Sequence, residues 1–132
     1  MSRENVDAVL RSLESWNRGD VDGWLELAHP DLEFRTSGVY PGTDVIYRGQ
    51  AELRRFWTAF REPWESLHID VDQAREVGDD VVVPATFGAH GRDGISVQRE
   101  VAWIWRFVDE VAARVDAYAS WEAALEAAGL SE

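Results

Sequence analysis

The sequence predicts an α+β domain in which a curved antiparallel sheet packs on helices that mostly precede it. Segments of helical periodicity fill much of the first half of the chain, and four consecutive alternating segments fill most of the second. Short turns join those four segments, so neighbouring strands should run antiparallel. A twisted sheet of this length curls around a long amphipathic helix into a cone, whose interior need not be completely filled.

Two helices are expected at the start of the chain. Apolar residues recur at helical spacing from Val6 to Trp16, and Gly19 ends this helix. Asp20 can cap a second, short helix, which Pro30 stops.

Two further helices follow the same rules. A third is expected over about residues 50–61, where apolar residues recur at i, i+3, i+4 and i+7, and Pro63 closes it. Ser120 caps a short last helix, which Gly129 ends.

The strongest strand signal lies in residues 97–107. One face carries Trp103, Trp105 and a Phe with Arg99 at its start, and the other carries Ala102 and Ile104, so both faces should be partly covered. A turn then leads into a shorter strand over residues 111–119, which makes a hairpin.

Three more strands are expected from alternation, over residues 32–37, 67–72 and 81–89. Pro84 cannot donate to a ladder, so a bulge or an unpaired position is expected there. Residues 38–48 are rich in Gly, Pro and Asp, which indicates an ordered loop.

Composition narrows the function classes. The net charge of −12 opposes binding to nucleic acid and to anionic membranes. All 13 basic residues are Arg and there is no Cys, so lysine Schiff bases, thiol nucleophiles and thiolate metal sites are excluded. The polar start of the chain and the lack of a long apolar span predict a cytoplasmic protein.

Three stretches resemble a known family. GDVDGWLELAHPDLEF, YRGQAELRRFW, and AWIWRF with YASWEAALEAAGL are similar to the SnoaL-like branch of the nuclear transport factor 2-like superfamily. The resemblance covers residues 1–132 as one domain. It implies a cone-shaped fold, with a curved sheet on three helices plus a short C-terminal helix, a conical pocket, and a homodimer through the outer sheet face. Members include polyketide cyclases, ketosteroid isomerases, epoxide hydrolases and dehydratases.

The ketosteroid isomerase chemistry does not transfer to this chain. The family's tyrosine donor, aspartate base and protonated aspartate fall approximately on Ser12, Arg35 and Trp103. None of the three is retained, and the enolate mechanism needs a base and two donors at those places.

The candidate catalytic residues are Glu33, Arg35 and Arg99. Glu33 and Arg35 share one strand face, which the family fold turns toward the pocket. Glu33 is either a general base or a structural carboxylate paired with Arg. Arg99 either has a protein or ligand anion as its partner or reaches water near the strand end. A catalytic carboxylate should lie unpaired beside a cavity, whereas a structural one should be saturated by Arg.

Aromatic residues are the candidates for substrate binding. Trp57, Trp103 and Trp105 line a flat apolar cavity or simply pack in the core, and Phe56 and Tyr47 join them in the predicted set. His29, His68 and His90 are widely separated, so neither a metal nor another cofactor is expected.

These observations favour a cofactor-free enzyme that acts by acid–base proton transfer on a small, mostly apolar or aromatic molecule. Cyclisation, isomerisation, dehydration and hydrolysis are the candidate reactions. Glu33 would be the base, and Arg99 and Arg35 would stabilise an anion. The alternative is a non-catalytic ligand-binding or dimeric structural domain of the same fold.

Overall fold

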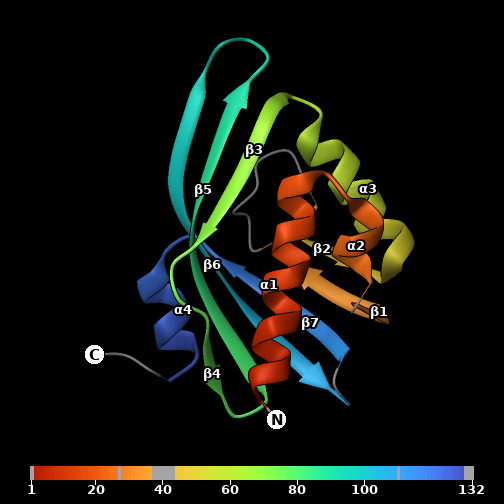
Figure 1. The fold of residues 1–132 in the computed structure, drawn as a ribbon, viewed down its shortest axis with the longest axis vertical. Helices are drawn as coiled ribbons and strands as arrows, with labels where there is room; N and C mark the ends of the chain where they lie inside the picture. Colours follow the sequence, from red (N-terminus) through yellow and green to blue (C-terminus); the bar gives the residue numbers. More distant parts are fainter. Residues whose placement is uncertain (1, 27, 37–43, 110, 130–132) are drawn as a thin grey trace.

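The computed structural model describes residues 2–26, 28–36, 44–109 and 111–129, and Figure 1 shows the arrangement of the elements. The helices are α1 (Ser2–Arg18), α2 (Val21–Leu25), α3 (Gly49–Arg61) and α4 (Trp121–Ala127). The strands are β1 (Ala28–Arg35), β2 (Ile46–Arg48), β3 (Trp64–Val71), β4 (Arg75–Val77), β5 (Asp80–Gly91), β6 (Ser96–Val108) and β7 (Val111–Tyr118).

The strands form one curved, unclosed sheet in the order β2-β1-β7-β6-β5-β3, with β4 also paired to β5. All pairs are antiparallel except β1 with β7, which run parallel. The expected antiparallel sheet is therefore mixed. The two parallel strands lie far apart in the sequence, so no hairpin dictates their relative direction.

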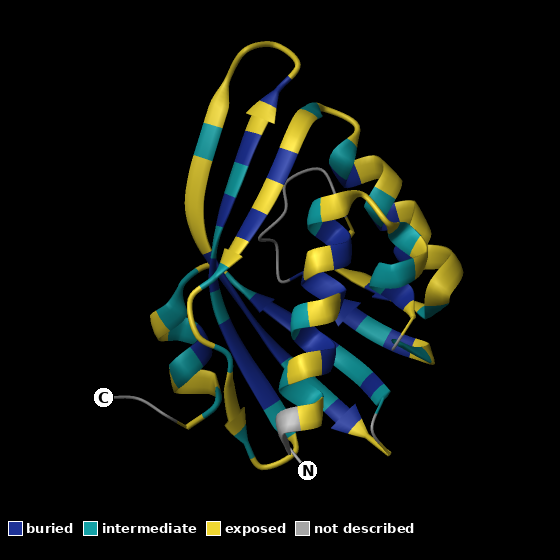
Figure 2. Ribbon diagram, viewed as in Figure 1, coloured by how far each residue is buried: buried dark blue, intermediate teal, exposed yellow. Residues whose placement is uncertain are grey.

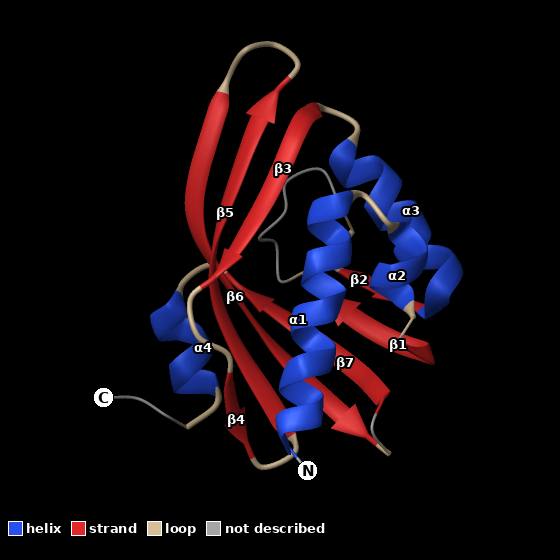
Figure 3. Ribbon diagram, viewed as in Figure 1, coloured by secondary structure: helices blue, strands red, loops and turns tan. Residues whose placement is uncertain are grey.

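The helices cover the two faces of the sheet unequally, as Figure 3 shows. α1, α2 and α3 lie on the inner face with the larger buried cluster, and α4 packs on the outer face. Strand β6 serves both layers: Trp103 belongs to the inner cluster, whereas Ala102 and Ile104 lie beneath α4. This confirms the expectation that both faces of β6 are covered.

The buried residues of α1 form one stripe along the helix, and this side of the helix faces the sheet (Figure 2).

Asn17, near the end of α1, joins this helix to the edge strand β3. Its Nδ2 donates to the Ile69 carbonyl at 2.9 Å, and its Oδ1 accepts from the Ile69 amide at 2.8 Å. One side chain thus satisfies both outward-facing backbone groups of an edge residue.

Three predicted helix boundaries are confirmed, the end at Gly19 and the caps at Asp20 and Ser120. Gly19 follows α1 with φ of 77°, a conformation that L-residues with a Cβ disfavour. The Asp20 side chain accepts from the Gly23 amide, and the Ser120 hydroxyl accepts from the Ala123 amide.

Two expected boundaries were wrong. α2 ends at Leu25 and β1 already begins at Ala28, so Pro30 lies within a strand and does not stop the helix. The loop was expected over residues 38–48; residues 38–43 lie outside the described ranges, and Ile46–Arg48 form the short strand β2, which pairs with β1.

Pro84 is accommodated without a bulge, because the register of β5 with β6 runs unbroken through it. Its carbonyl accepts from the Asp72 amide at 2.9 Å, so its nitrogen also faces the β3 and β4 side. The β3 pairing ends at Ala85 and the β4 pairing begins at Val82. The proline therefore occupies a break in the neighbouring ladder, where no donor is needed.

None of the helices within the described ranges is long and apolar enough to cross a membrane.

Candidate functional site

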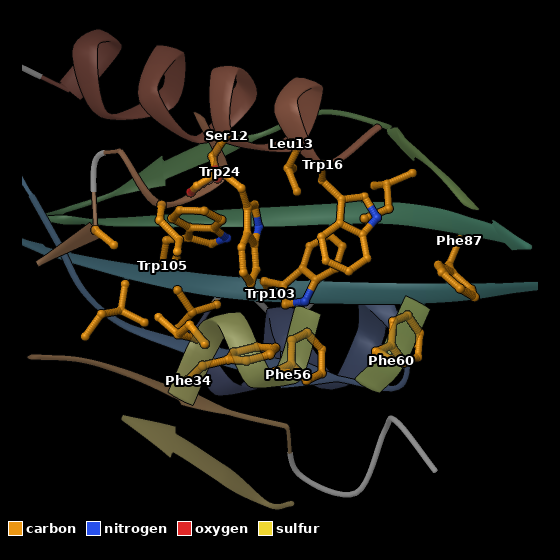
Figure 4. Close-up of a pocket in the computed structure, with 16 residues that line it drawn as sticks. Ser12, Leu13, Trp16, Trp24, Phe34, Phe56, Phe60, Phe87, Trp103 and Trp105 are labelled. Atoms are coloured by element: carbon orange, nitrogen blue, oxygen red, sulfur yellow. Dashed lines mark hydrogen bonds between the residues drawn. The ribbon is translucent and has the colours of Figure 1, made fainter. Parts of the chain in front are cut away.

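A cavity of about 70 Å³, measured as the space open to the centres of water molecules, lies between the inner helices and the sheet. At about 10–15 Å³ per water centre, it has room for several waters or a small ring system. Figure 4 shows the 16 residues that line it. They are Ser12, Leu13, Trp16, Trp24, Leu25, Ala28, Leu32, Phe34, Leu53, Phe56, Phe60, Ile69, Phe87, Trp103, Trp105 and Val115.

Phe56 is at the centre of the aromatic wall and is only 2% exposed. Its ring meets Phe34 edge-on at 5.1 Å and stacks on Phe60 at 5.6 Å between centroids. Trp16 and Trp24 are 5.4 Å apart on the helical side of the cavity. Such contacts between large rings hold the wall rigid and apolar.

The structure places the predicted substrate-binding residues in two layers. Phe56, Trp103 and Trp105 line the cavity directly. Trp57 lies behind the wall, where its ring is 4.9 Å from that of Trp16. Tyr47 is also in the second layer, 5.1 Å from Phe56, and its hydroxyl accepts from the Asp44 amide at 2.8 Å.

Other lining residues were not in the predicted set. Trp16 and Ser12 come from α1, Trp24 from α2, and Phe87 from β5. For Trp16 a signal was present, because it belongs to the apolar stripe of the first predicted helix. That stripe identifies a buried face, but it does not identify which buried residues border an empty space.

The polar groups of the lining are few. The Ser12 hydroxyl donates to the Trp24 carbonyl at 3.1 Å. Among the described residues, two buried side-chain polar atoms have no hydrogen-bond partner, the indole Nε1 atoms of Trp16 and Trp105. Ser12, Arg35 and Trp103 are the positions that correspond approximately to the catalytic residues of ketosteroid isomerases. Of these, Ser12 and Trp103 line the cavity.

Glu33 and Arg35 lie on the opposite face of β1, and this corrects the expected orientation of the strand. Leu32 and Phe34 alternate with them and line the cavity instead. The reason is that burying two apolar side chains is favourable, whereas burying a charged face is costly.

Glu33 is saturated by two arginines. Its Oε1 accepts from Arg48 Nη2 at 2.9 Å, and its Oε2 accepts from Arg35 Nε. These bonds, that from Arg48 first and that from Arg35 second, lower the pKa of Glu33 below its ordinary value. By the criterion set from the sequence, Glu33 has the surroundings of a structural carboxylate.

Arg99 is exposed on β6, so the alternative in which it reaches water is the one observed. It is the direct partner of Phe87 in the β5–β6 register, and directly opposed residues of an antiparallel pair share a face. Arg99 therefore lies on the inner face beside one end of the cavity wall.

The outer face carries a charged network over β5, β6 and β7. Asp116 is 5% exposed and lies 3.0 Å from Arg114 Nε and 3.6 Å from Arg106 Nε. Arg106 also pairs with Asp80 at 2.8 Å. This network shares the outer face with α4.

Each of the three histidines has its own local hydrogen-bond partner. Exposed His68 pairs with Asp70 at 2.8 Å, His90 bonds the Ser96 hydroxyl at 2.7 Å, and His29 Nδ1 accepts from the Asp31 amide. In the part of the chain that the structure describes, no group of three His, Cys, Asp or Glu residues is arranged to hold a metal ion.

The sequence matches the model of one known protein family. The family model for the SnoaL-like domain matches residues 9–115. No curated protein sequence matches the chain.

Solved structures with the same fold are numerous. TerC, co-crystallised with polyporic acid, is 24% identical with a TM-score of 0.80, covering 96% of this chain and 98% of its own. An NTF2-like protein of unknown function from Burkholderia pseudomallei is 22% identical with a TM-score of 0.81, and the match covers 93% of this chain and 95% of that protein's chain. A putative SnoaL-like polyketide cyclase from Jannaschia is 19% identical with a TM-score of 0.75, and the match covers 89% of this chain and 85% of that protein's chain.

Proposed function

The chain belongs to the SnoaL-like domain family, and on that premise we propose that its cavity binds a small, mostly apolar, ring-shaped molecule. The observation that carries the proposal is the lining itself, in which four Trp and four Phe side chains surround an open space. Concave apolar sites with a few convergent polar groups are the usual form of small-molecule sites. TerC, which has the same fold, was co-crystallised with polyporic acid, and this supports a small-molecule ligand here as well.

The position of Glu33 favours ligand binding over a proton-transfer reaction in which Glu33 is the base. Its carboxylate lies on the outer side of β1 and is held by Arg35 and Arg48, so it does not meet the requirement of a free base beside the cavity. The alternative set out from the sequence, a non-catalytic binding domain, thus becomes the leading function.

Proton-transfer catalysis remains the second candidate, supported by Arg99. Its exposed guanidinium lies on the inner face, opposite the cavity-lining Phe87. A ligand that extends past Phe87 would bring an enolate or carboxylate oxygen toward this cation, which would stabilise the negative charge.

A thermal-shift screen tests both candidates. Monocyclic, bicyclic and terpenoid compounds, each as neutral and acidic members, are added to the wild type and to Ala28→Leu. Ala28 lines the cavity, so the larger side chain should fill the space and abolish stabilisation. Ala59→Leu, on the exposed side of α3, is the matched control.

A ligand at about 100 times its Kd should stabilise the wild type and Ala59→Leu by about 2.7 kcal/mol. Equal stabilisation of Ala28→Leu would place the ligand outside the cavity, and no hit in the panel would contradict the proposal. Turnover of a hit that Arg99→Gln abolishes would establish the enzyme, whereas binding without turnover supports the binding domain.

We also propose a homodimer through the outer sheet face, as the family resemblance implies. α4 covers part of that face, and the charged side chains of β1 and β7 are left to meet the partner copy. The monomer mass is 14.9 kDa, so light scattering should give about twice this value, and a monomer mass would refute the dimer.

A further inference from the structure

We propose that the Trp105 indole N–H is the polar anchor of the cavity and that it donates to a neutral acceptor oxygen on the ligand. This inference rests on the proposed function and narrows it to one chemical class. The class is a small ring compound that carries a ketone or an equivalent uncharged carbonyl oxygen.

The Trp105 nitrogen is placed to do this. Its residue lines the cavity, and its Nε1 is a buried donor without a partner among the described residues. Figure 4 shows the indole of Trp105 with its nitrogen on the side of the ring toward Trp24, another residue of the lining. The indole stacks on Phe107 at 6.4 Å with an interplanar angle of 18°, a ring contact that gives the N–H no acceptor.

Trp16 is the weaker candidate for the anchor, although its Nε1 is also without a partner. Its indole is enclosed by other rings, with Trp57 at 4.9 Å and 77° and Trp24 at 5.4 Å and 55°. Arg61 covers it further, with the guanidinium carbon 4.7 Å from the ring centroid. Trp16 is thus packed among several rings and a guanidinium group, whereas the ring of Trp105, which also lines the cavity, stacks on Phe107.

A buried donor without a partner is unfavourable, and few native groups remain so. No protein group in the described ranges accepts from this N–H, so the bond is available to a ligand. A hydrocarbon in the cavity leaves the donor unpaired, whereas a ketone of the same shape supplies an acceptor. The lining offers this acceptor no charged partner, so a neutral oxygen matches the site better than a carboxylate.

The test compares indane with 1-indanone, which share a bicyclic skeleton and differ by one carbonyl. In a nitrogen-15 correlation spectrum, each of the seven Trp residues gives one indole N–H signal. 1-Indanone should move the Trp105 indole proton downfield, as hydrogen-bond formation does, and indane should not. The Trp121 indole, which donates to the Ala85 carbonyl at 2.8 Å, should stay unmoved and serves as the internal control.

Affinities give an independent readout. Removing the donor in Trp105→Phe should reduce the selectivity for 1-indanone over indane by about threefold to tenfold. Trp64→Phe is the matched control, because Trp64 is outside the lining and packs on Phe87 at 6.4 Å. Its selectivity should equal that of the wild type.

The outcomes separate this inference from the proposed function. If both compounds bind in the cavity but the Trp105 signal does not move downfield and Trp105→Phe keeps the selectivity, the anchor is refuted while the binding function stands. If neither compound perturbs the cavity residues, the binding function fails and the anchor fails with it.

Discussion

Replacing Asn17 by alanine should destabilise the domain by about 2 kcal/mol, because one side chain supplies two hydrogen bonds to the edge strand β3. The bonds to the Ile69 amide and carbonyl are 2.8 and 2.9 Å long. A net contribution of about 1 kcal/mol each gives the total. With about 2.1 cal/mol/K of unfolding entropy per residue over 132 residues, the melting temperature should fall by about 7 °C.

Calorimetry and urea unfolding measure the loss, and amide exchange of Ile69 should become faster because its outward N–H loses its acceptor. Asn17→Asp should be at least as destabilising, since a carboxylate cannot donate to the Ile69 carbonyl. Glu14→Ala, an exposed change on the same helix, is the control and should stay within about 0.5 kcal/mol of the wild type. If Asn17→Ala is equally neutral, the reasoning that this amide holds β3 to α1 is refuted.

Three further predictions concern stability. Gly23→Ala should cost about 1–3 kcal/mol in urea unfolding, since a Cβ would lie 2.5 Å from Ser15 Oγ and 2.6 Å from Asp20 Oδ2; a neutral result would contradict this packing. The pKa of Glu33 is below the ordinary 4.5, so its stabilisation is present above that pH and is lost as the pH falls through the folded-state pKa. Glu33→Gln should therefore be less stable than the wild type at neutral pH, with a gap that closes in acid; a constant gap would exclude the carboxylate as the cause. The pKa of Tyr118 is raised above 10.0, first by burial and then by Asp116, so stability should fall as the pH rises past 10, and Tyr118→Phe should lose less over that range.

The features that the sequence predicts correctly are those that depend on neighbours in the chain. The alternation in β6 identifies two buried faces, and the cap residues Asp20 and Ser120 act on amides three positions away. The parallel pairing of β1 with β7 and the three-residue strand β2 are fixed by distant partners. The alternation of apolar and polar residues within one segment does not indicate which distant strand will pair with it.

The site was harder to predict for the same reason. Alternation shows that Glu33 and Arg35 share a face and that Leu32 and Phe34 share the other, but it does not say which face the helices cover. The choice of the charged face followed from the family resemblance and was wrong, because apolar burial decided the orientation.

Cavity borders depend on the packing of several elements at once. Trp103 and Trp105 were predicted from β6 and do line the space, whereas Trp57 packs one layer behind it. Trp16 reaches the cavity from α1 because α1 and α3 leave a gap against the sheet. The sequence supplies the aromatic residues, and the three-dimensional arrangement decides which of them a ligand can touch.

The most direct test of the proposed binding site is a crystal of the protein grown with 5-bromo-1-indanone and measured at the bromine absorption edge. An anomalous peak is expected inside the cavity between α1, α3 and β6, with the ketone oxygen within hydrogen-bond distance of Trp105 Nε1. Bromine found only on the outer face, or a cavity that excludes the compound at saturating concentration, would contradict the account.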